Sequence, residues 1–97
     1  MPSYILLGNW TDQGIRAVKD SPKRLDAFKQ MLKNAGGELR GAYLTLGAYD
    51  LVVAIEAPSD DVVAKLVLSV ASLGNVRTTT LKAFPEEEFR KIVGSIA

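Results

Sequence analysis

The chain has 97 residues, of which 47% are apolar and 24% charged, and it contains neither cysteine nor histidine. This composition predicts one folded domain over residues 1–97, and it excludes disulfides, thiolate nucleophiles, imidazole catalysis and nearly every structural zinc site. The net charge of +1 excludes the clustered positive charge that a nucleic-acid binder needs. We find no secretion signal and no membrane-spanning segment, so we expect a cytoplasmic location with no metal, cofactor, nucleic-acid or membrane partner.

The first predicted elements are a strand and a broken helical region. Residues 4–10 (YILLGNW) are apolar on both faces and predict a strand. A helical pattern follows over residues 12–19. The Ser-Pro pair at 21–22 predicts a helix restart, with serine as N-cap and proline at the first helical position. Apolar residues then keep helical spacing until the two glycines at 36–37, which predict a left-handed helix end.

The middle of the chain predicts a β-hairpin. Residues 38–46 and 50–57 are rich in residues that favour strands. Between them, Gly47-Ala48 fits a two-residue loop with glycine at the first central position, which is the type II′ pattern. We therefore expect two antiparallel strands joined by a tight turn.

The remaining elements complete a recognisable order. Residues 58–61 (PSDD) start a helix with a serine cap and acidic residues at the positive end of the helix dipole. That helix runs to Leu73 and stops at Gly74. Residues 75–84 predict a fourth strand, and residues 85–93 a short C-terminal helix. The order βαββαβ predicts a ferredoxin-like α+β sandwich, an antiparallel four-stranded sheet with both long helices on one face.

Two patterns predict a homo-oligomer. In the second long helix the polar residues form one narrow stripe, and Val and Leu fill more of the circumference than contact with its own sheet requires. The strand at 50–57 is apolar on both faces, whereas the helices can cover only one face of the sheet. We expect the other face to pack on a second copy. The alternative is that the C-terminal helix folds over it.

Two pairs of candidate ligand-binding residues lie at strand ends. Asn9 and Trp10 could line a pocket; alternatively, Trp10 covers the core and Asn9 binds the backbone of the following helix start. Tyr49 and Asp50 could present a phenol and a carboxylate to a ligand. Alternatively, Asp50 accepts backbone N–H bonds around the hairpin and Tyr49 packs across the sheet.

The fourth strand adds two further candidates. Arg77 could bind a carboxylate or phosphate in bidentate fashion, or it could pair with Glu56. Thr79 lies in a run of three threonines, which suit a strand for steric reasons alone. No catalytic residue can be assigned. The candidate ligand-binding residues are therefore Asn9, Trp10, Tyr49, Asp50, Arg77 and Thr79.

Four segments carry a resemblance to a known family: NWTDQG at 9–14, DSPKR at 20–24, YDLVVAIEAP at 49–58 and LGNVRTTTLKAF at 73–84. The chain resembles the GYD-domain proteins, bacterial proteins named for a Gly-Tyr-Asp turn, over almost its whole length. It departs from the family pattern at Ala48, in the turn Gly47-Ala48-Tyr49-Asp50, where a small apolar residue stands in place of the polar one that family members often carry. The family is similar to the dimeric α/β-barrel group, in which two ferredoxin-like protomers pack sheet to sheet. The resemblance implies a fold and an assembly, and it implies no established activity.

Two functions from different classes stay open. The turn and the threonine-rich strand are similar to the effector domain of leucine-responsive regulators, which implies a stand-alone small-molecule-binding or regulatory oligomer. The alternative is a cofactor-independent enzyme resembling the monooxygenases or isomerases of the dimeric α/β-barrel group. In such an enzyme Asp50 or Glu56 would be the base, with its pKa raised by burial. Other residues would orient the substrate: Asn9, Trp10, Tyr43 and Tyr49. We favour the first function because the chain lacks histidine and a convincing carboxylate pair.

Overall fold

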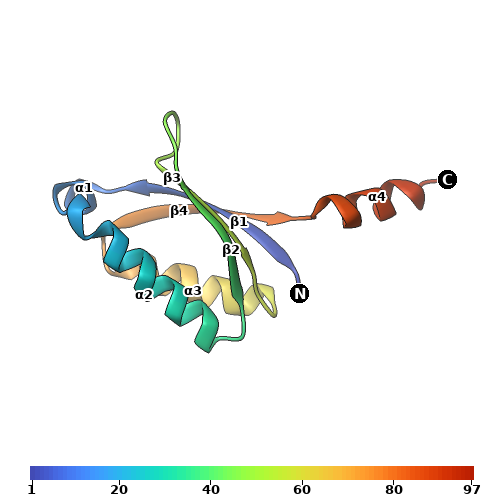
Figure 1. The fold of residues 1–97 in the computed structure, drawn as a ribbon, viewed down its shortest axis with the longest axis horizontal. Helices are drawn as coiled ribbons and strands as arrows, with labels where there is room; N and C mark the ends of the chain where they lie inside the picture. The colour runs from blue at the N-terminus through green and yellow to red at the C-terminus, as the bar shows by residue number, and fades with distance from the viewer.

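The computed structural model describes all residues, Met1–Ala97, and shows a four-stranded antiparallel sheet with two long helices on one face (Figure 1). The sheet has the order β2-β3-β1-β4. The strands are β1 (Ser3–Trp10), β2 (Glu38–Leu44), β3 (Leu51–Glu56) and β4 (Val76–Ala83). The helices are α1 (Asp12–Arg16), α2 (Ser21–Asn34), α3 (Asp60–Ser72) and α4 (Glu86–Gly94). This arrangement confirms the predicted ferredoxin-like fold.

The register of β1 assigns residues to the two faces of the sheet. Tyr4 and Leu6 are buried and alternate with less buried residues, so the even positions of β1 face the helices. Residues in register share a face, which extends this assignment to the neighbouring strands. We call the other side of the sheet the open face. It consists of Ser3, Ile5, Leu7, Asn9, Glu38, Gly41, Tyr43, Val52, Ala54, Glu56, Arg77, Thr79, Leu81 and Ala83.

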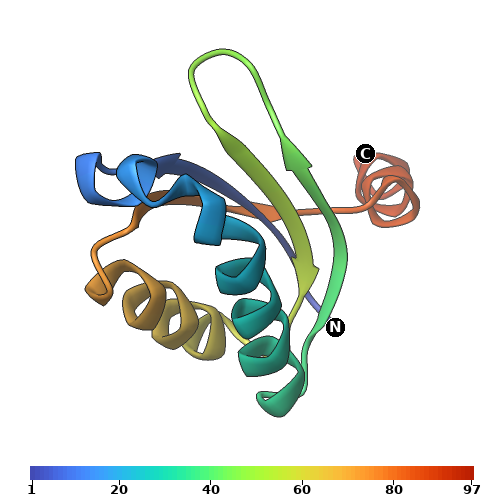
Figure 2. The same ribbon diagram turned by 60° about the vertical axis from the view of Figure 1, so that its left-hand side comes forward.

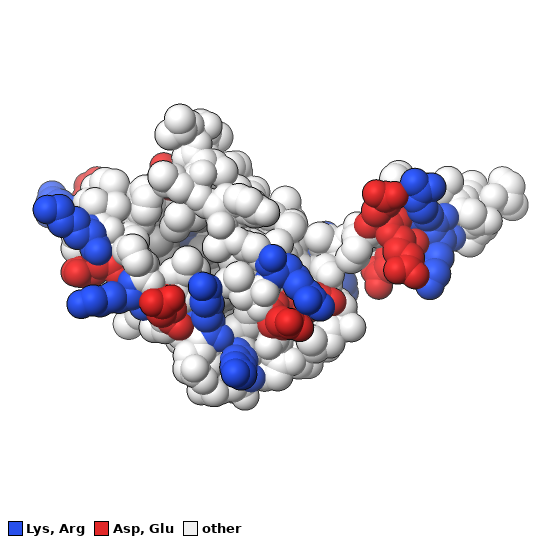
Figure 3. Space-filling model, viewed as in Figure 1, with Lys and Arg blue, Asp and Glu red and all other residues white.

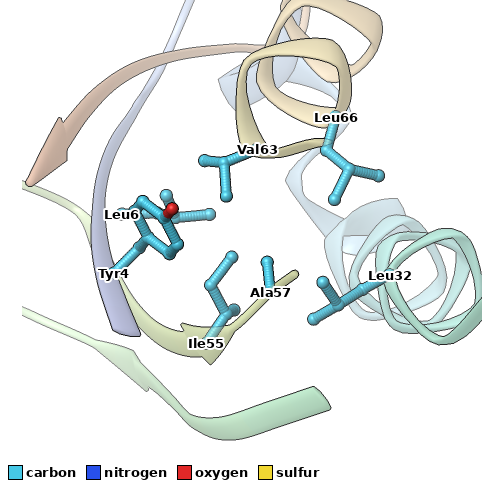
Figure 4. Packing of buried hydrophobic residues seen from close by; sticks show 7 residues of the cluster. All are labelled: Tyr4, Leu6, Leu32, Ile55, Ala57, Val63 and Leu66. Carbon is cyan, nitrogen blue, oxygen red and sulfur yellow. The ribbon is translucent and has the colours of Figure 1, made fainter. Parts of the chain in front are cut away.

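The hydrophobic core lies between the sheet and the helices α2 and α3 (Figure 4). Leu32 from α2 and Ile55 from β3 are completely buried at its centre. The other buried apolar side chains come from β1, α3 and the segment after β3: Tyr4, Leu6, Ala57, Val63 and Leu66. The chain exposes 6652 Å² in total, whereas a compact 10.5 kDa monomer exposes about 5,400 Å². Its radius of gyration is 14.5 Å, compared with about 12.5 Å for a compact domain of this length.

The signals at helix ends agree with the structure in three places. Ser59 is the N-cap of α3, and its hydroxyl accepts a hydrogen bond from the Val62 N–H at 3.4 Å. Gly74 follows α3 with φ of 85°, and Gly36 follows α2 with φ of 88°. Glycine adopts these left-handed conformations without the steric cost that other residues meet. The predicted ends of both long helices are therefore confirmed. None of the helices combines the length and the hydrophobicity needed to cross a membrane.

The prediction of Ser21 as an N-cap is wrong. Residues 12–19 form α1 and the start of one 3₁₀ turn, Val18–Asp20, and α2 then begins at Ser21 itself. The Ser21 hydroxyl accepts hydrogen bonds from two side chains, the Trp10 Nε1–H and the Arg24 Nη2–H, each at 3.1 Å. These tertiary contacts engage the oxygen that would otherwise bind the helix N-terminus.

The predicted two-residue hairpin loop is also wrong. The two strands end at Leu44 and Leu51, so the loop between them is longer. The Thr45 N–H donates to the Asp50 carbonyl at 2.8 Å, and the Thr45 hydroxyl donates to the Tyr49 carbonyl at 2.6 Å. These bonds close the loop around four residues, with Gly47 at φ of 140°.

Helix α4 stands clear of the rest of the chain. It continues the direction of β4 away from α2 and α3, as the two ribbon views show (Figures 1 and 2). Its apolar residues Phe89, Ile92 and Val93 are about half exposed. The alternative in which this helix folds over the open face is therefore wrong for a single copy. A helix of nine residues is marginally stable in water on its own, so we expect α4 to be supported by contacts outside its own chain.

A polar network fastens β1 to the start of α3. The Tyr4 hydroxyl donates a hydrogen bond to the Asp60 carboxylate, which also pairs with Lys82 at 3.2 Å between Nζ and Oδ1. This hydrogen bond, together with burial of the phenol, raises the pKa of Tyr4 to about 12. The same bond and the Lys82 ammonium lower the pKa of Asp60. Folding therefore favours the neutral phenol and the ionised carboxylate.

This network predicts a pH-dependent contribution to stability. The contribution of Asp60 is present above the pKa of an unfolded aspartate and is lost as pH falls through its lowered pKa. The contribution of Tyr4 is present below pH ~10 and is lost as pH rises toward 12. We expect Tyr4→Phe to be less stable than the wild type near pH 7, with the difference shrinking at both extremes. Urea unfolding from pH 3 to 12 measures this, with Tyr43→Phe as the control at a tyrosine that takes no part in the network. A difference that stays constant up to pH 12 would contradict the coupling.

Candidate functional site

A cavity of about 450 Å³ lies between α2, α3 and the helix-covered face of the sheet. Thirteen of its eighteen lining residues are hydrophobic. Its walls include Leu6 from β1, Val53 from β3, Phe28 from α2, and Val67 and Val70 from α3. Small-molecule sites usually measure about 300–1,000 Å³ and combine apolar walls with a few polar groups, so this cavity has the size and character of a site for a small ligand.

Trp10 forms part of the cavity wall at the end of β1. Its indole Nε1–H donates to the Ser21 hydroxyl at 3.1 Å, which joins β1 to the first turn of α2. This side chain is half-buried and does not belong to the fully buried core. Of the two interpretations drawn from the sequence, the position agrees with the one in which Trp10 lines a pocket.

Arg24 is the one charged residue that lines the cavity. Its Nη2 donates to three neutral acceptors, the carbonyls of Gly14 and Ala17 at 3.3 and 3.1 Å and the Ser21 hydroxyl at 3.1 Å. Sequence reasoning missed this residue, because a lone arginine in a mildly basic helix looks like part of a solvated face. The sequence feature that could have pointed to Arg24 is the DSPKR segment at 20–24, which carries the family resemblance. In this segment Arg24 lies one helical turn after Ser21, which contacts Trp10.

The loop residues Tyr49 and Asp50 lie outside the cavity lining. The Asp50 Oδ2 accepts a hydrogen bond from the Trp10 backbone N–H at 3.0 Å, and the Asp50 N–H donates to the Gly8 carbonyl at 2.9 Å. The carboxylate therefore accepts a backbone N–H, as the alternative interpretation expected, although the donor belongs to β1 and not to the hairpin. The backbone carbonyl of Tyr49 takes part in closing the loop.

The other three candidates lie on the open face, on the opposite side of the sheet from the cavity. Asn9 and Arg77 are direct cross-strand partners, and Thr79 follows two residues along β4. The Asn9 side chain makes no hydrogen bond to the helix start; the hydroxyl of Thr11 accepts one there instead, from the Gly14 N–H at 3.1 Å. The six candidates are thus divided among the cavity, the loop and the open face.

The suggested pairing of Arg77 with Glu56 is wrong. Glu56 lies beside Ser3 at the start of β1, and Arg77 lies beside Asn9 near its end. The sheet therefore holds the two charges at opposite ends of β1. Glu56 pairs instead with Arg40, at the irregularity in β2.

Two of the segments that carry the family resemblance bind each other. The Thr11 N–H donates to the Asn75 carbonyl at 3.0 Å, and the Thr11 hydroxyl donates to the Gly74 carbonyl. Gln13 adds hydrogen bonds from Nε2 to the Leu73 carbonyl at 3.1 Å and to the Asn75 Oδ1 at 3.0 Å. These contacts join the start of α1 to the end of α3, so much of the NWTDQG and LGNV pattern is explained by the fold.

The sequence-family model of the GYD domain matches residues 4–93, and the chain belongs to this family. It is 37% identical over 86 residues to the "Glutamine synthetase and cystathionine beta-lyase binding protein" of Thermus thermophilus. That alignment covers 88% of this chain and 90% of the relative. The Thermus protein is named for binding other proteins.

Three solved structures share the fold. FFRP-DM1 has a TM-score of 0.61 at 17% identity, covering 87% of this chain and 100% of that one. TTHA0845 from Thermus thermophilus has a TM-score of 0.55 at 23% identity, covering 87% of this chain and 94% of that one. MtbAldR has a TM-score of 0.59 at 14% identity, covering 88% of this chain. The chain spans 52% of MtbAldR.

Proposed function

We propose that this chain is a non-catalytic regulatory protein that acts by binding enzymes and works as a homo-oligomer. The observation that carries this proposal is the 37% identity to the Thermus binding protein, which extends over nearly the whole of both chains. A binding role transfers more readily than a catalytic one, because it requires a surface and not a set of aligned reactive groups. By this relationship, the candidate partners are glutamine synthetase and cystathionine beta-lyase.

The accessible area supports assembly with a second copy. The chain exposes about 1,200 Å² more than a compact monomer of its mass, and a standard interface buries about 800 Å² on each partner. Helix α4, which stands clear of the chain, accounts for part of this excess (Figure 1). The apolar residues at the centre of the open face, Ile5, Leu7, Val52 and Ala54, are only partly buried in a single copy. Charged residues gather over the helices in Figure 3, while the surface around the β2–β3 hairpin is almost free of charge.

The cavity supports small-molecule binding better than it supports catalysis. Its volume of about 450 Å³ is sufficient for a ligand. Neither carboxylate considered as a base lines the cavity. Asp50 accepts a hydrogen bond from the Trp10 backbone, and Glu56 pairs with Arg40. A general base must lie within hydrogen-bond reach of the proton it removes. We therefore favour the regulatory function over the monooxygenase-like or isomerase-like alternative.

Direct binding to purified enzymes tests the proposal. The chain is immobilised, and glutamine synthetase and cystathionine beta-lyase from the same organism are passed over it in a biolayer interferometry experiment. We expect at least one enzyme to bind with micromolar or tighter affinity, and its activity to change when the complex forms. An unrelated enzyme of similar size and charge is the control. If neither enzyme binds at tens of micromolar while the chain is folded, the proposed partners are wrong.

A further inference from the structure

We propose that the cavity binds a small apolar molecule that carries one carboxylate, with Arg24 as the group that binds the carboxylate. This inference deepens the proposed function and rests on it, since the molecule would act as an effector of a regulatory protein. It assigns the chemical class of the ligand, which neither the fold nor the relatives provide.

The shape of the ligand follows from the distribution of polar groups in the cavity. Trp10, Ser21 and Arg24 are linked by hydrogen bonds, so three of the polar side chains in the lining are gathered at one place. Most of the remaining wall is aliphatic or aromatic, including Phe28 and Val70. A ligand that fits this arrangement has an apolar body with a single polar end. A volume near the lower end of the usual range requires a small body.

The charge of the ligand follows from the state of Arg24. Its hydrogen bonds all leave from Nη2 and end on neutral oxygens, while Nε and Nη1 keep unused N–H groups. The four ion pairs of the chain involve other residues, so no carboxylate of the protein neutralises this guanidinium. The side chain is only partly exposed. A partly buried, unpaired guanidinium with free donors binds a carboxylate well, in a bidentate arrangement.

The number of charges selects a monocarboxylate. Arg24 is the single charged residue in the lining, and the positive end of the α2 dipole lies beside it in the first turn of that helix. A phosphate dianion or a dicarboxylate would bring a second negative charge into an apolar cavity without a partner, which is costly. Short branched-chain or aromatic carboxylic acids satisfy both the charge and the walls.

Matched acids and amides test the charge requirement in the unmodified chain. The probes are phenylacetate, 4-methylpentanoate and 3-methylbutanoate, each compared with its neutral amide by isothermal titration calorimetry. Trp10 is the only tryptophan and lines the cavity, so its fluorescence reports occupancy at the site itself. We expect at least one acid to bind below millimolar concentration, to change the Trp10 emission, and to bind tenfold or more tightly than its amide.

Two arginine variants then test the assigned residue. Arg24→Gln removes the guanidinium, and we expect the affinity for the acid to fall by roughly tenfold to hundredfold, with the affinity for the amide unchanged. Arg16→Gln removes the same charge from an exposed residue outside the lining and should leave both affinities unchanged. Val70→Phe, which fills the cavity from α3, should weaken the acid and the amide alike.

Three outcomes would overturn the inference. An acid and its amide that bind equally would show that no anion is recognised, and this comparison decides the matter even where Arg24→Gln fails to fold. Equal losses in Arg24→Gln and Arg16→Gln would remove the assigned role of Arg24. Absence of binding by every probe would remove the ligand class. None of these outcomes affects the direct enzyme-binding experiment, so the proposed function stands or falls separately.

Discussion

Replacing Gly14 with alanine is expected to lower the free energy of unfolding by about 2–5 kcal/mol, from overpacking and lost hydrogen bonds. A Cβ atom at Gly14 would lie 1.9 Å from the carbonyl oxygen of Asn75. This oxygen belongs to the backbone, so it cannot turn away as a flexible side chain could. The start of α1 would have to move away from the end of α3. That movement would break the bonds from Thr11 to Asn75 and Gly74. Total stabilities of domains this size are about 5–15 kcal/mol, so the loss is large.

Gly94→Ala is the matched control for this substitution. A Cβ atom at Gly94 meets nothing within 4 Å, and the residue lies at the end of α4 with an ordinary negative φ. Alanine there should leave stability unchanged or raise it by up to about 1 kcal/mol, because glycine is the poorer helix former. Urea unfolding monitored by circular dichroism measures both variants. If Gly14→Ala unfolds at the wild-type urea midpoint, the close contact between α1 and the end of α3 is not what holds these segments together.

The fold was predictable because each element carries a local signal. The short apolar runs of β1 and β3, the cap at Ser59 and the glycine after α3 all act within a few residues. The predictions failed where side-chain contacts overrode the usual role of a residue type. The Ser21 hydroxyl binds the side chains of Trp10 and Arg24 and does not cap α2. In the hairpin, the two bonds that Thr45 makes to the backbone of Tyr49 and Asp50 close a longer loop than the glycine suggested.

The candidate site was predictable only in part, for two different physical reasons. Asn9 and Trp10 are neighbours in one strand, and neighbours in a strand point to opposite faces of the sheet. The sequence alone therefore predicts that the two side chains lie on different faces. Placing both in one pocket overlooked this alternation. Arg24 is a different case. The role proposed for it depends on the absence of a nearby carboxylate and on the shape of the cavity, and both are properties of the folded structure.

Leu7→Glu is expected to separate the proposed oligomer into folded monomers. Leu7 lies at the centre of the open face, next to Val52 in β3, and is only partly exposed in a single copy. In a monomer the new carboxylate can reach water from this surface. In a face-to-face pair it would be buried among apolar side chains, and both copies would carry the cost. Arg77, beside Asn9, is the diagonal neighbour of this position on the same face and would offset part of that cost. Burying a charge in an interface costs several kcal/mol, so the dimer dissociation constant should rise roughly hundredfold or more.

Sedimentation velocity at micromolar concentration measures this effect. Ile15→Glu makes the same change in α1, away from the open face, at a side chain that is 48% exposed, and it should sediment as the wild type does. Leu68→Glu makes the change on the outer side of α3, where that side chain is 69% exposed. Dissociation by Leu68→Glu with an intact Leu7→Glu oligomer would place the interface on α3, the other apolar surface that the sequence singled out. A wild-type chain that sediments as a monomer would contradict assembly through either surface.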